Sequence, residues 1–201
     1  MSLGIINSGI CNLLSLENAL SHLDIPFVTS SNRDELNQCS KLILPGVGSF
    51  DAGMTNLNKL GLDEFIINKA ASGIDILGIC LGMQLLFSSS EEGVLDGLSL
   101  IEGKVLKFPT NIKKIPHIGW NDLHYKSDNM NLLNQNQKND SFYFIHSYFV
   151  DCQDSVDYCS TIHEGFEFKS MIQFNNIYAT QFHPEKSQDA GLKILKEFNN
   201  L

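Results

Sequence analysis

The run from Ile74 to Phe87 constrains the fold of this chain more than any other stretch. An apolar segment rich in Ile and Leu meets Cys80, which is flanked by Gly78 and Gly82, and then continues with helical spacing. This pattern is typical of a sharp strand-to-helix turn that presents a nucleophile above a sheet. The N–H groups that open the helix would favour a thiolate. A buried cysteine that serves as a small apolar side chain explains the motif equally well.

The first half of the chain alternates short apolar runs with amphipathic segments. Strands are predicted at 3–6, 25–29 and 41–44, and helices at 13–23, 33–39 and 56–72, the last ending at Gly73. Such βαβ repeats indicate a parallel sheet with helices on both faces. Ligands bind such sheets beyond the carboxyl ends of the strands, where Cys80 and the loop at Pro45 would both lie.

The second half has a different character. A helix is predicted at 82–90, followed by alternating segments that indicate a mixed or antiparallel extension, at 103–108, 141–148, 158–163 and 177–182. The stretch 127–140 is rich in Asn and is expected to be a polar surface loop. Ser187 and Asp189 favour the start of a last helix, whose buried face would carry Leu192, Leu195 and Phe198. We expect residues 1–201 to form a single domain.

Charge and cysteine content exclude several classes of function. The formal net charge is −9, which argues against a surface for nucleic acid or anionic membrane. The five cysteines show no C-x-x-C spacing and the N-terminus does not resemble a secretory signal, so a reduced, cytoplasmic protein is expected. No apolar run approaches the ~20 residues of a membrane span.

Two further motifs carry chemistry that would suit Cys80. Pro45 to Phe50 follows a strand directly and contains two glycines, which lets backbone N–H groups of Val47 and Gly48 turn toward an anion together with the N–H of Leu81. These three groups would form an oxyanion hole. A plain tight turn explains the same residues.

The second motif contains His183 and Glu185. Pro184 favours an extended backbone at His183, so both side chains tend to point the same way. Glu185 would then orient the ring of His183, whose other nitrogen would take the proton of Cys80. The alternative is a surface histidine beside a helix start. The presence of the Cys80 motif and the Pro45 loop in the same chain argues against that alternative.

Taken together, the blocks 44–50, 78–87 and 181–187 resemble the triad-type (class I) glutamine amidotransferases. The blocks 116–121 and 144–148 make the chain similar, over nearly its whole length, to the glutaminase subunits of imidazole glycerol phosphate synthase. The resemblance implies a three-layer, doubly wound, mostly parallel α/β fold with an antiparallel extension. It also implies a glutaminase without cofactor or metal that forms a glutamyl thioester on Cys80, with His183 and Glu185 completing the triad. Its ammonia would pass to a (β/α)8-barrel cyclase subunit in a heterodimer that makes imidazole glycerol phosphate and an aminoimidazole carboxamide nucleotide.

Carried over by motif position, five residues are expected to bind glutamine: Gly48, Gln84, Glu92, Ser147 and Tyr148. Glu91 is adjacent to Glu92, and the sequence does not separate the two. Trp120 and Asn121 match the motif that faces the cyclase, although Trp120 would also suit an ordinary core.

The first loop, 7–14, departs from the pattern that the resemblance implies. Cys11 stands where glycine is usual, and Leu14 stands where arginine is common. This departure bears on the partner rather than on the glutaminase chemistry. A related subgroup that supplies ammonia for amidation of a surface-polysaccharide sugar is therefore an alternative. An idle homologue with a regulatory role is a second one, opposed by the intact triad residues.

Overall fold

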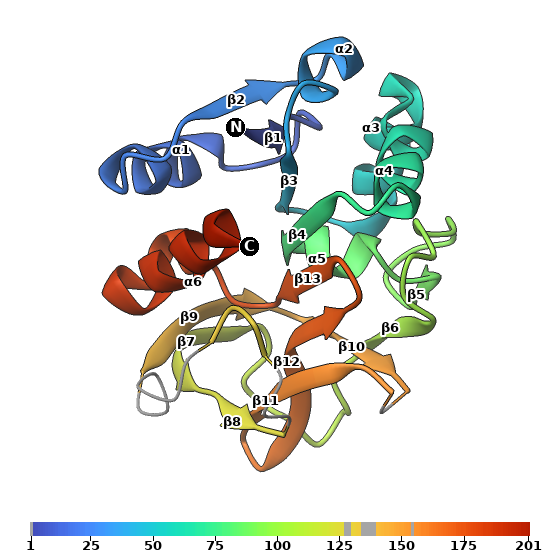
Figure 1. The fold of residues 1–201 in the computed structure, drawn as a ribbon. Coiled ribbons are helices and arrows are strands. Elements are labelled where there is room, and N and C mark those ends of the chain that lie inside the picture. The colour runs from blue at the N-terminus through green and yellow to red at the C-terminus, as the bar shows by residue number, and fades with distance from the viewer. Residues whose placement is uncertain (1, 127–129, 134–139, 154) are drawn as a thin grey trace.

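The computed structural model describes residues 2–126, 130–133, 140–153 and 155–201. Five parallel strands form one half of a large sheet, in the order β2-β1-β3-β4-β13 (Figure 1). Their bounds are Phe27–Ser30, Leu3–Ile6, Lys41–Gly46, Asp75–Cys80 and Ile177–Thr180. The predicted parallel α/β sheet is confirmed.

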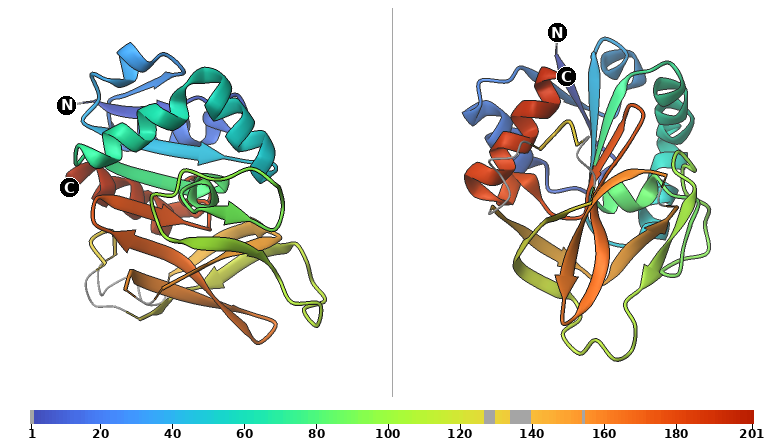
Figure 2. Two further views of the ribbon diagram at one scale, coloured as in Figure 1. Left: turned by 90° about the vertical axis from the view of Figure 1, so that its right-hand side faces the viewer. Right: turned by 60° about the horizontal axis from the view of Figure 1, so that its bottom comes forward.

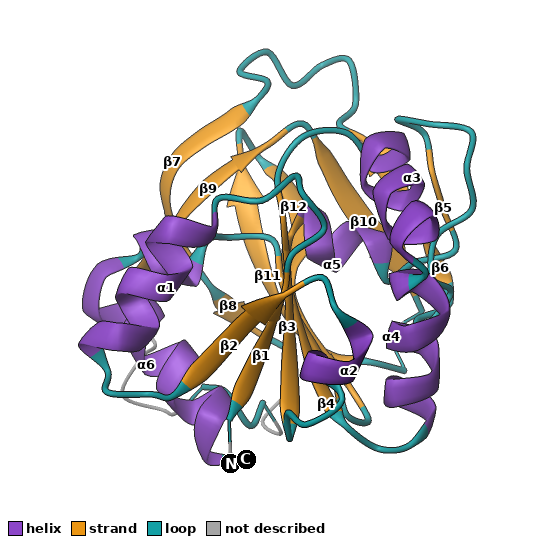
Figure 3. Ribbon diagram, turned by 90° about the horizontal axis from the view of Figure 1, so that it is seen from above, coloured by secondary structure: helices purple, strands orange, loops and turns teal. Residues whose placement is uncertain are grey.

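Alternating side chains of the parallel strands feed two separate cores. Ile43 on β3 and Leu77 on β4 contact one core, while Leu42 and Leu44 face the other. Both faces are therefore apolar, as a parallel sheet covered on each side requires. In Figure 3, α1 (Leu13–His22) and α6 (Gln188–Asn200) cover one face, and the remaining helices cover the other.

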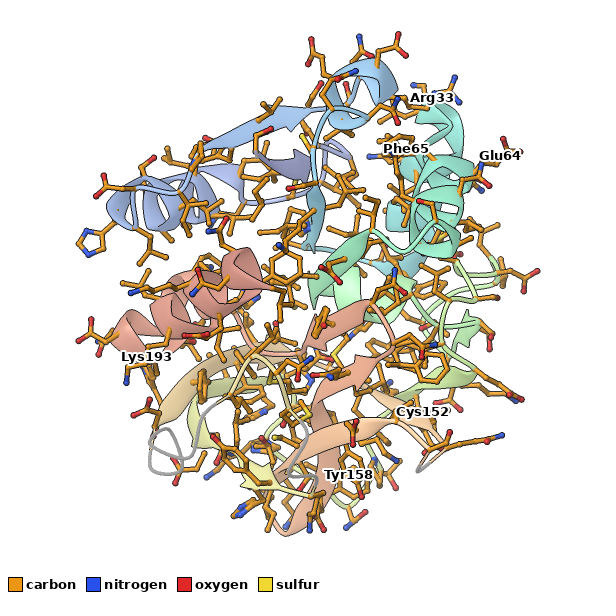
Figure 4. The ribbon with its side chains drawn as sticks, in the orientation of Figure 1. Arg33, Glu64, Phe65, Cys152, Tyr158 and Lys193 are labelled. Carbon is orange, nitrogen blue, oxygen red and sulfur yellow. The ribbon has the colours of Figure 1, made fainter. Side chains whose placement is uncertain are left out.

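The other face carries α2 (Arg33–Leu36), α3 (Phe50–Leu60) and α4 (Leu62–Ala71). Figure 2 shows α3 and α4 running across this face. The prediction of one helix over 56–72 was wrong at its start and in its continuity, because Gly61 adopts a left-handed φ of 63° and breaks the segment. Arg33 of α2 lies over this break, as Figure 4 shows near Glu64 and Phe65.

The remaining strands of the large sheet form the antiparallel extension, in the order β12-β10-β6, with β5 parallel to β6 at the edge. β11 pairs with β12 and with β8. The bounds are Phe166–Phe174 for β12, Tyr148–Cys152 for β10, Gly103–Lys107 for β6, Ser89–Ser90 for β5, Asp157–His163 for β11 and His124–Tyr125 for β8.

The strand predicted at 177–182 does not belong wholly to this extension. It forms β13, which turns back from β12 and runs parallel to β4, with Thr180 opposite Ile79. The turn at Asn175, with a φ of 53°, reverses the chain tightly enough for β13 to enter beside β4. The residues after β13 therefore leave the sheet at the carboxyl ends of the parallel strands, next to Cys80 at the end of β4.

The predicted strand 141–148 is divided at Ser147. β9 (Ser141–His146) pairs with β7 (His117–Asp122) in a separate two-stranded ribbon, and the chain then enters the large sheet as β10. In Figure 1 this ribbon lies below α6. Ser147 is thus held at a junction between two sheets.

The predicted polar loop 127–140 lies largely outside the described residues. Within the part that is described, residues 130–133 form a turn as expected, but Met130 and Leu132 are buried in the core, so the prediction of a surface position was wrong for these two residues. Across the described ranges, no helix combines the length and apolarity that crossing a bilayer requires.

The last helix begins where the sequence predicts, and Leu195 and Phe198 are fully buried while Leu192 packs against the core. Ser187 does not cap it through a side-chain bond. Its hydroxyl instead donates to His183 O and accepts from Tyr143 N. Ser187 therefore ties the His183 loop to the β7–β9 ribbon.

Candidate active site

Cys80 lies at a strained turn between β4 and the short helix α5 (Leu81–Leu85). Its backbone has φ 55° and ψ −107°, a region that a residue with a side chain rarely occupies. The helix predicted over 82–90 is shorter than expected, because Ser89 and Ser90 already pair with β6. A Cβ at Gly82 would overlap the carbonyl oxygen of Leu44, so only glycine permits this close approach of α5 to β3.

His183 and Glu185 are brought to Cys80 from the end of β13. Nδ1 of His183 lies 2.7 Å from Oε1 of Glu185, and both side chains are almost fully buried. Burial lowers the pKa of His183, but its interactions with the Cys80 thiol and the Glu185 carboxylate outweigh this effect and raise the pKa to about 10. These interactions favour the protonated ring, which is the form that can donate to a leaving group.

A cavity of about 340 Å³ opens beside Cys80. Its lining includes the five residues expected from their motif positions to bind glutamine, namely Gly48, Gln84, Glu92, Ser147 and Tyr148. Oε2 of Glu92 accepts from the N–H of Phe50 at 2.7 Å, at the start of α3. The Glu91 carboxylate instead accepts from Lys107 N, so the structure brings Glu92 rather than Glu91 to the cavity.

The Pro45 loop lies directly beside the nucleophile, because Gly46 of β3 is in register with Cys80 of β4. Val47 and Leu81 both line the cavity, but the N–H of Val47 donates to Ile10 O at 3.0 Å. In this conformation that donor is occupied and does not serve an oxyanion. Gly48 has a φ of 98°, in the left-handed half of the backbone map.

Several residues near Cys80 received no role from the sequence. Pro116, Ile145, His146 and Lys186 line the cavity, and Gln181 lies within reach of the sulfur. All five belong to motif blocks quoted above. Their position within those motif blocks could have indicated that they lie near the site. The spacing of the motifs does not show what each of these side chains does there.

His117 of β7 and His146 of β9 form a buried pair across the ribbon. Nδ1 of His117 lies 2.9 Å from Nε2 of His146, whose own Nδ1 lies 2.8 Å from the carbonyl oxygen of Tyr148. Burial, with a contribution from neighbouring histidines, lowers the pKa of His117 to about 4 and that of His146 to about 3. Both rings are therefore neutral at pH 7, and His146 donates to Tyr148 O.

The two residues expected at a partner interface lie on β7, outside the catalytic cavity. Trp120 is half exposed and stacks edge-on against Tyr143. Nδ2 of Asn121 donates to Ile162 O. Ile118 and Ile145 on the same ribbon are also exposed, so this face presents a group of apolar side chains to solvent.

Comparison with known proteins places these observations in a family. The model of "Glutamine amidotransferase class-I" matches residues 5–200. The chain is 43% identical to "Imidazole glycerol phosphate synthase subunit HisH 2" of Methanococcus maripaludis, over 98% of each chain. It is 44% identical to "Imidazole glycerol phosphate synthase subunit HisH" of Chlorobaculum tepidum, over 96% of this chain and 97% of that protein.

Solved structures agree with the fold. A "Crystal structure of glutamine amidotransferase" superposes with a TM-score of 0.76 at 16% identity, covering all of both chains. The "Structure of PurLQS from Thermotoga maritima" gives a TM-score of 0.74 at 18% identity, covering 99% of this chain and 97% of that one. With Cys80 at a strained turn and the family model spanning nearly every residue, the chain belongs to the class-I glutamine amidotransferases.

Proposed function

We propose that this chain is the glutaminase subunit of an imidazole glycerol phosphate synthase in histidine biosynthesis, folded as a single domain of residues 1–201 and working in a cytoplasmic heterodimer. The observation that carries the proposal is the sequence identity of 43% and 44% to two HisH proteins over nearly the full length of both chains. Cys80 and His183 line one cavity and Glu185 contacts His183 behind it, which supports the proposal.

The proposed reaction begins with attack of the Cys80 sulfur on the side-chain amide carbon of L-glutamine. The C–N bond then breaks, the proton of His183 goes to the departing nitrogen, and ammonia leaves a glutamyl thioester on Cys80. Water attacks the thioester while His183 takes its proton, which releases glutamate and restores the thiolate. Glu185 holds the imidazole in orientation throughout, through the 2.7 Å contact to Nδ1.

Glutamine would be held by groups around the cavity of about 340 Å³. The Glu92 carboxylate suits the α-amino group, and the backbones at Gly48 and Ser147–Tyr148 offer donors and acceptors for the carboxylate and the amide. Burial, and next the charges of Glu92 and Glu91, raise the pKa of Tyr148, which supports the nearness of Tyr148 to these carboxylates.

The oxyanion of the tetrahedral intermediate needs donors at the Pro45 loop and at Leu81. Because the N–H of Val47 is bonded to Ile10 O, the isolated chain holds part of this hole away from the substrate. Loss of one well-placed donor costs about 2.7–4 kcal/mol, or ~10²–10³ in rate. We therefore expect low activity for the chain alone and strong stimulation by a liganded partner.

The partner would bind the exposed face of the ribbon that carries Ile118, Trp120 and Ile145. Asn121 lies next to Trp120 on β7 but alternates to the other side of the strand, where it bonds to Ile162 O. The exposed face lies on the same ribbon as His146, which lines the cavity, so binding there is well placed to act on the site.

The test mixes the chain separately with a histidine-pathway cyclase and with a sugar amidotransferase subunit, each with its own acceptor. Glutamate release and ammonia transfer are measured in both mixtures. Stimulation by the cyclase alone is expected, with Trp120→Ala weakening it. Stimulation by the sugar enzyme alone would reject the histidine-pathway assignment, and high turnover by the isolated chain would reject the switch.

A further inference from the structure

Gln181, which follows β13, is completely buried beside the nucleophile. Its Nε2 lies 3.7 Å from the Cys80 sulfur, within the longer range of a hydrogen bond to sulfur. Its Oε1 accepts from Nε2 of Gln84 at 3.0 Å. A buried amide with both ends engaged is held in one place, since leaving either end unpaired would cost free energy.

The direction of this chain of hydrogen bonds is set by a backbone group. Nε2 of Gln84 also lies 3.2 Å from the carbonyl oxygen of Tyr148, and a carbonyl can only accept. The nitrogen of Gln84 must therefore point to Tyr148 and Gln181, so the oxygen of Gln181 faces Gln84. The nitrogen of Gln181 is left facing the sulfur.

We propose that Gln181 is a further catalytic residue, whose side-chain N–H donates to the Cys80 sulfur and stabilises the thiolate that attacks glutamine. Gln84 acts as a positioning residue that fixes the orientation of this donor through Tyr148 O. The inference rests on the proposed function, because it concerns the sulfur that carries the reaction.

Two other neighbours of the sulfur, Ile145 O and His183, do not fill this role. Ile145 O lies 3.8 Å from the sulfur and accepts from the thiol, so it favours the protonated form. His183 favours the thiolate while it is protonated, but it must give up its proton to the leaving ammonia. Gln181 cannot lose its proton in that step, so its donation to sulfur persists through the whole cycle.

A consequence for Gln84 follows from the same bonds. Both protons of its amide are used, one by Tyr148 O and one by Gln181 Oε1. Only its oxygen remains to meet glutamine in the cavity. Gln84 would therefore accept from an N–H of the substrate and would not donate to its carboxylate.

The test measures carbamidomethylation of Cys80 by iodoacetamide between pH 5 and 10, with each cysteine-containing peptide quantified by mass spectrometry. Gln181→Met keeps the volume and removes the donor. Because hydrogen bonds to charged groups are the stronger ones, we expect the pH midpoint to rise by about one unit, which lowers the rate by up to about 10-fold at pH values below the midpoint. The limiting rate at high pH should stay the same, since all of the sulfur is then thiolate.

Thr180→Val is the matched control, because it removes a neighbouring buried hydrogen bond, from Thr180 Oγ1 to Phe182 O at 3.0 Å, that does not involve the sulfur. It should leave the midpoint unchanged. An unchanged midpoint in Gln181→Met, or an equal change in Thr180→Val, would overturn the inference. If Gln181→Met fails to fold by circular dichroism, Gln181→Glu carries the test, since it keeps the acceptor for Gln84 but replaces the donor; its midpoint should also rise.

The assay contains neither glutamine nor a partner. Failure of the chain to support a cyclase would therefore refute the proposed function and leave the alkylation result readable. A normal glutaminase with unchanged alkylation in both Gln181 variants would refute only the role of Gln181.

Discussion

Replacement of Gly48 by alanine should activate the isolated chain. Gly48 has a φ of 98°, and a Cβ built there would meet no atom within 4 Å. The cost of alanine is therefore backbone strain alone, about 1–2 kcal/mol for an L-residue with positive φ. A flip of the Val47–Gly48 peptide turns the N–H of Gly48, the second loop donor of the proposed oxyanion hole, and leaves the N–H of Val47 bonded to Ile10 O. It changes the φ of Gly48 by roughly 180°, which brings it to a negative value that alanine accepts readily.

The substitution thus penalises the observed loop conformation and spares the flipped one. A difference of 1–2 kcal/mol shifts the ratio of two states about 5- to 30-fold. We expect glutamate release by the isolated Gly48→Ala chain to rise by about this factor. With a liganded cyclase bound, the rate should change little, because the partner already selects the flipped loop, so the degree of stimulation falls.

Gly165→Ala is the matched control. Gly165 has a φ of 84° and also has open space around a built Cβ, but it lies in the turn between β11 and β12, away from the cavity. It should lose similar stability in urea unfolding and leave glutaminase activity unchanged. A Gly48→Ala chain with unchanged or lower basal activity would refute the peptide flip. Equal activation of Gly165→Ala would show that the effect does not arise at the loop beside Cys80.

Cys80→Ala should abolish glutamate release while circular dichroism stays native, and residual turnover in that variant would exclude Cys80 as the nucleophile. His183→Ala should lower kcat more than Glu185→Gln, because the carboxylate only orients the ring; equal rates well above background would contradict these roles. Acid should destabilise the protein through His117 and His146. Their pKa values in the folded chain, about 4 and 3, lie below the unfolded value of about 6.5, so this contribution is complete above pH 6.5 and is lost as pH falls toward 4. Urea unfolding should show about 1–2 kcal/mol lost per histidine between pH 7.5 and 5, whereas equal stability at both values would refute a neutral pair.

Local signals in the sequence were sufficient for the parallel half of the fold and for the turn at Cys80. Glycine was needed at Gly82 for steric reasons, and the run of Ile and Leu before Cys80 is what a strand covered on both faces requires. His183 has the extended backbone that Pro184 favours, but Glu185 reaches its ring from a 3-10 turn at Pro184–Lys186 that the spacing of the two residues does not predict. These features depend on neighbours within a few residues.

Features that depend on pairing between distant parts of the chain could not be predicted from local sequence signals. No local signal shows that β13 inserts beside β4, or that Ser147 divides one apolar run between two sheets. The orientation of the Gln181 amide depends on Gln84 and on Tyr148 O, which come from other parts of the chain. The break at Gly61 was missed because isolated glycines are tolerated within helices.

The position of β13 has a consequence for synthesis of the protein on the ribosome. β4 is completed at Cys80, but its second neighbour is made about a hundred residues later, so one side of β4 stays unpaired while those residues are synthesised. Such an edge can pair with other chains until β13 closes it. The same closure delivers His183 to Cys80, so the nascent chain acquires its reactive pair only when the vulnerable edge disappears. Premature termination before residue 177 should therefore yield an aggregation-prone fragment rather than an uncontrolled glutaminase.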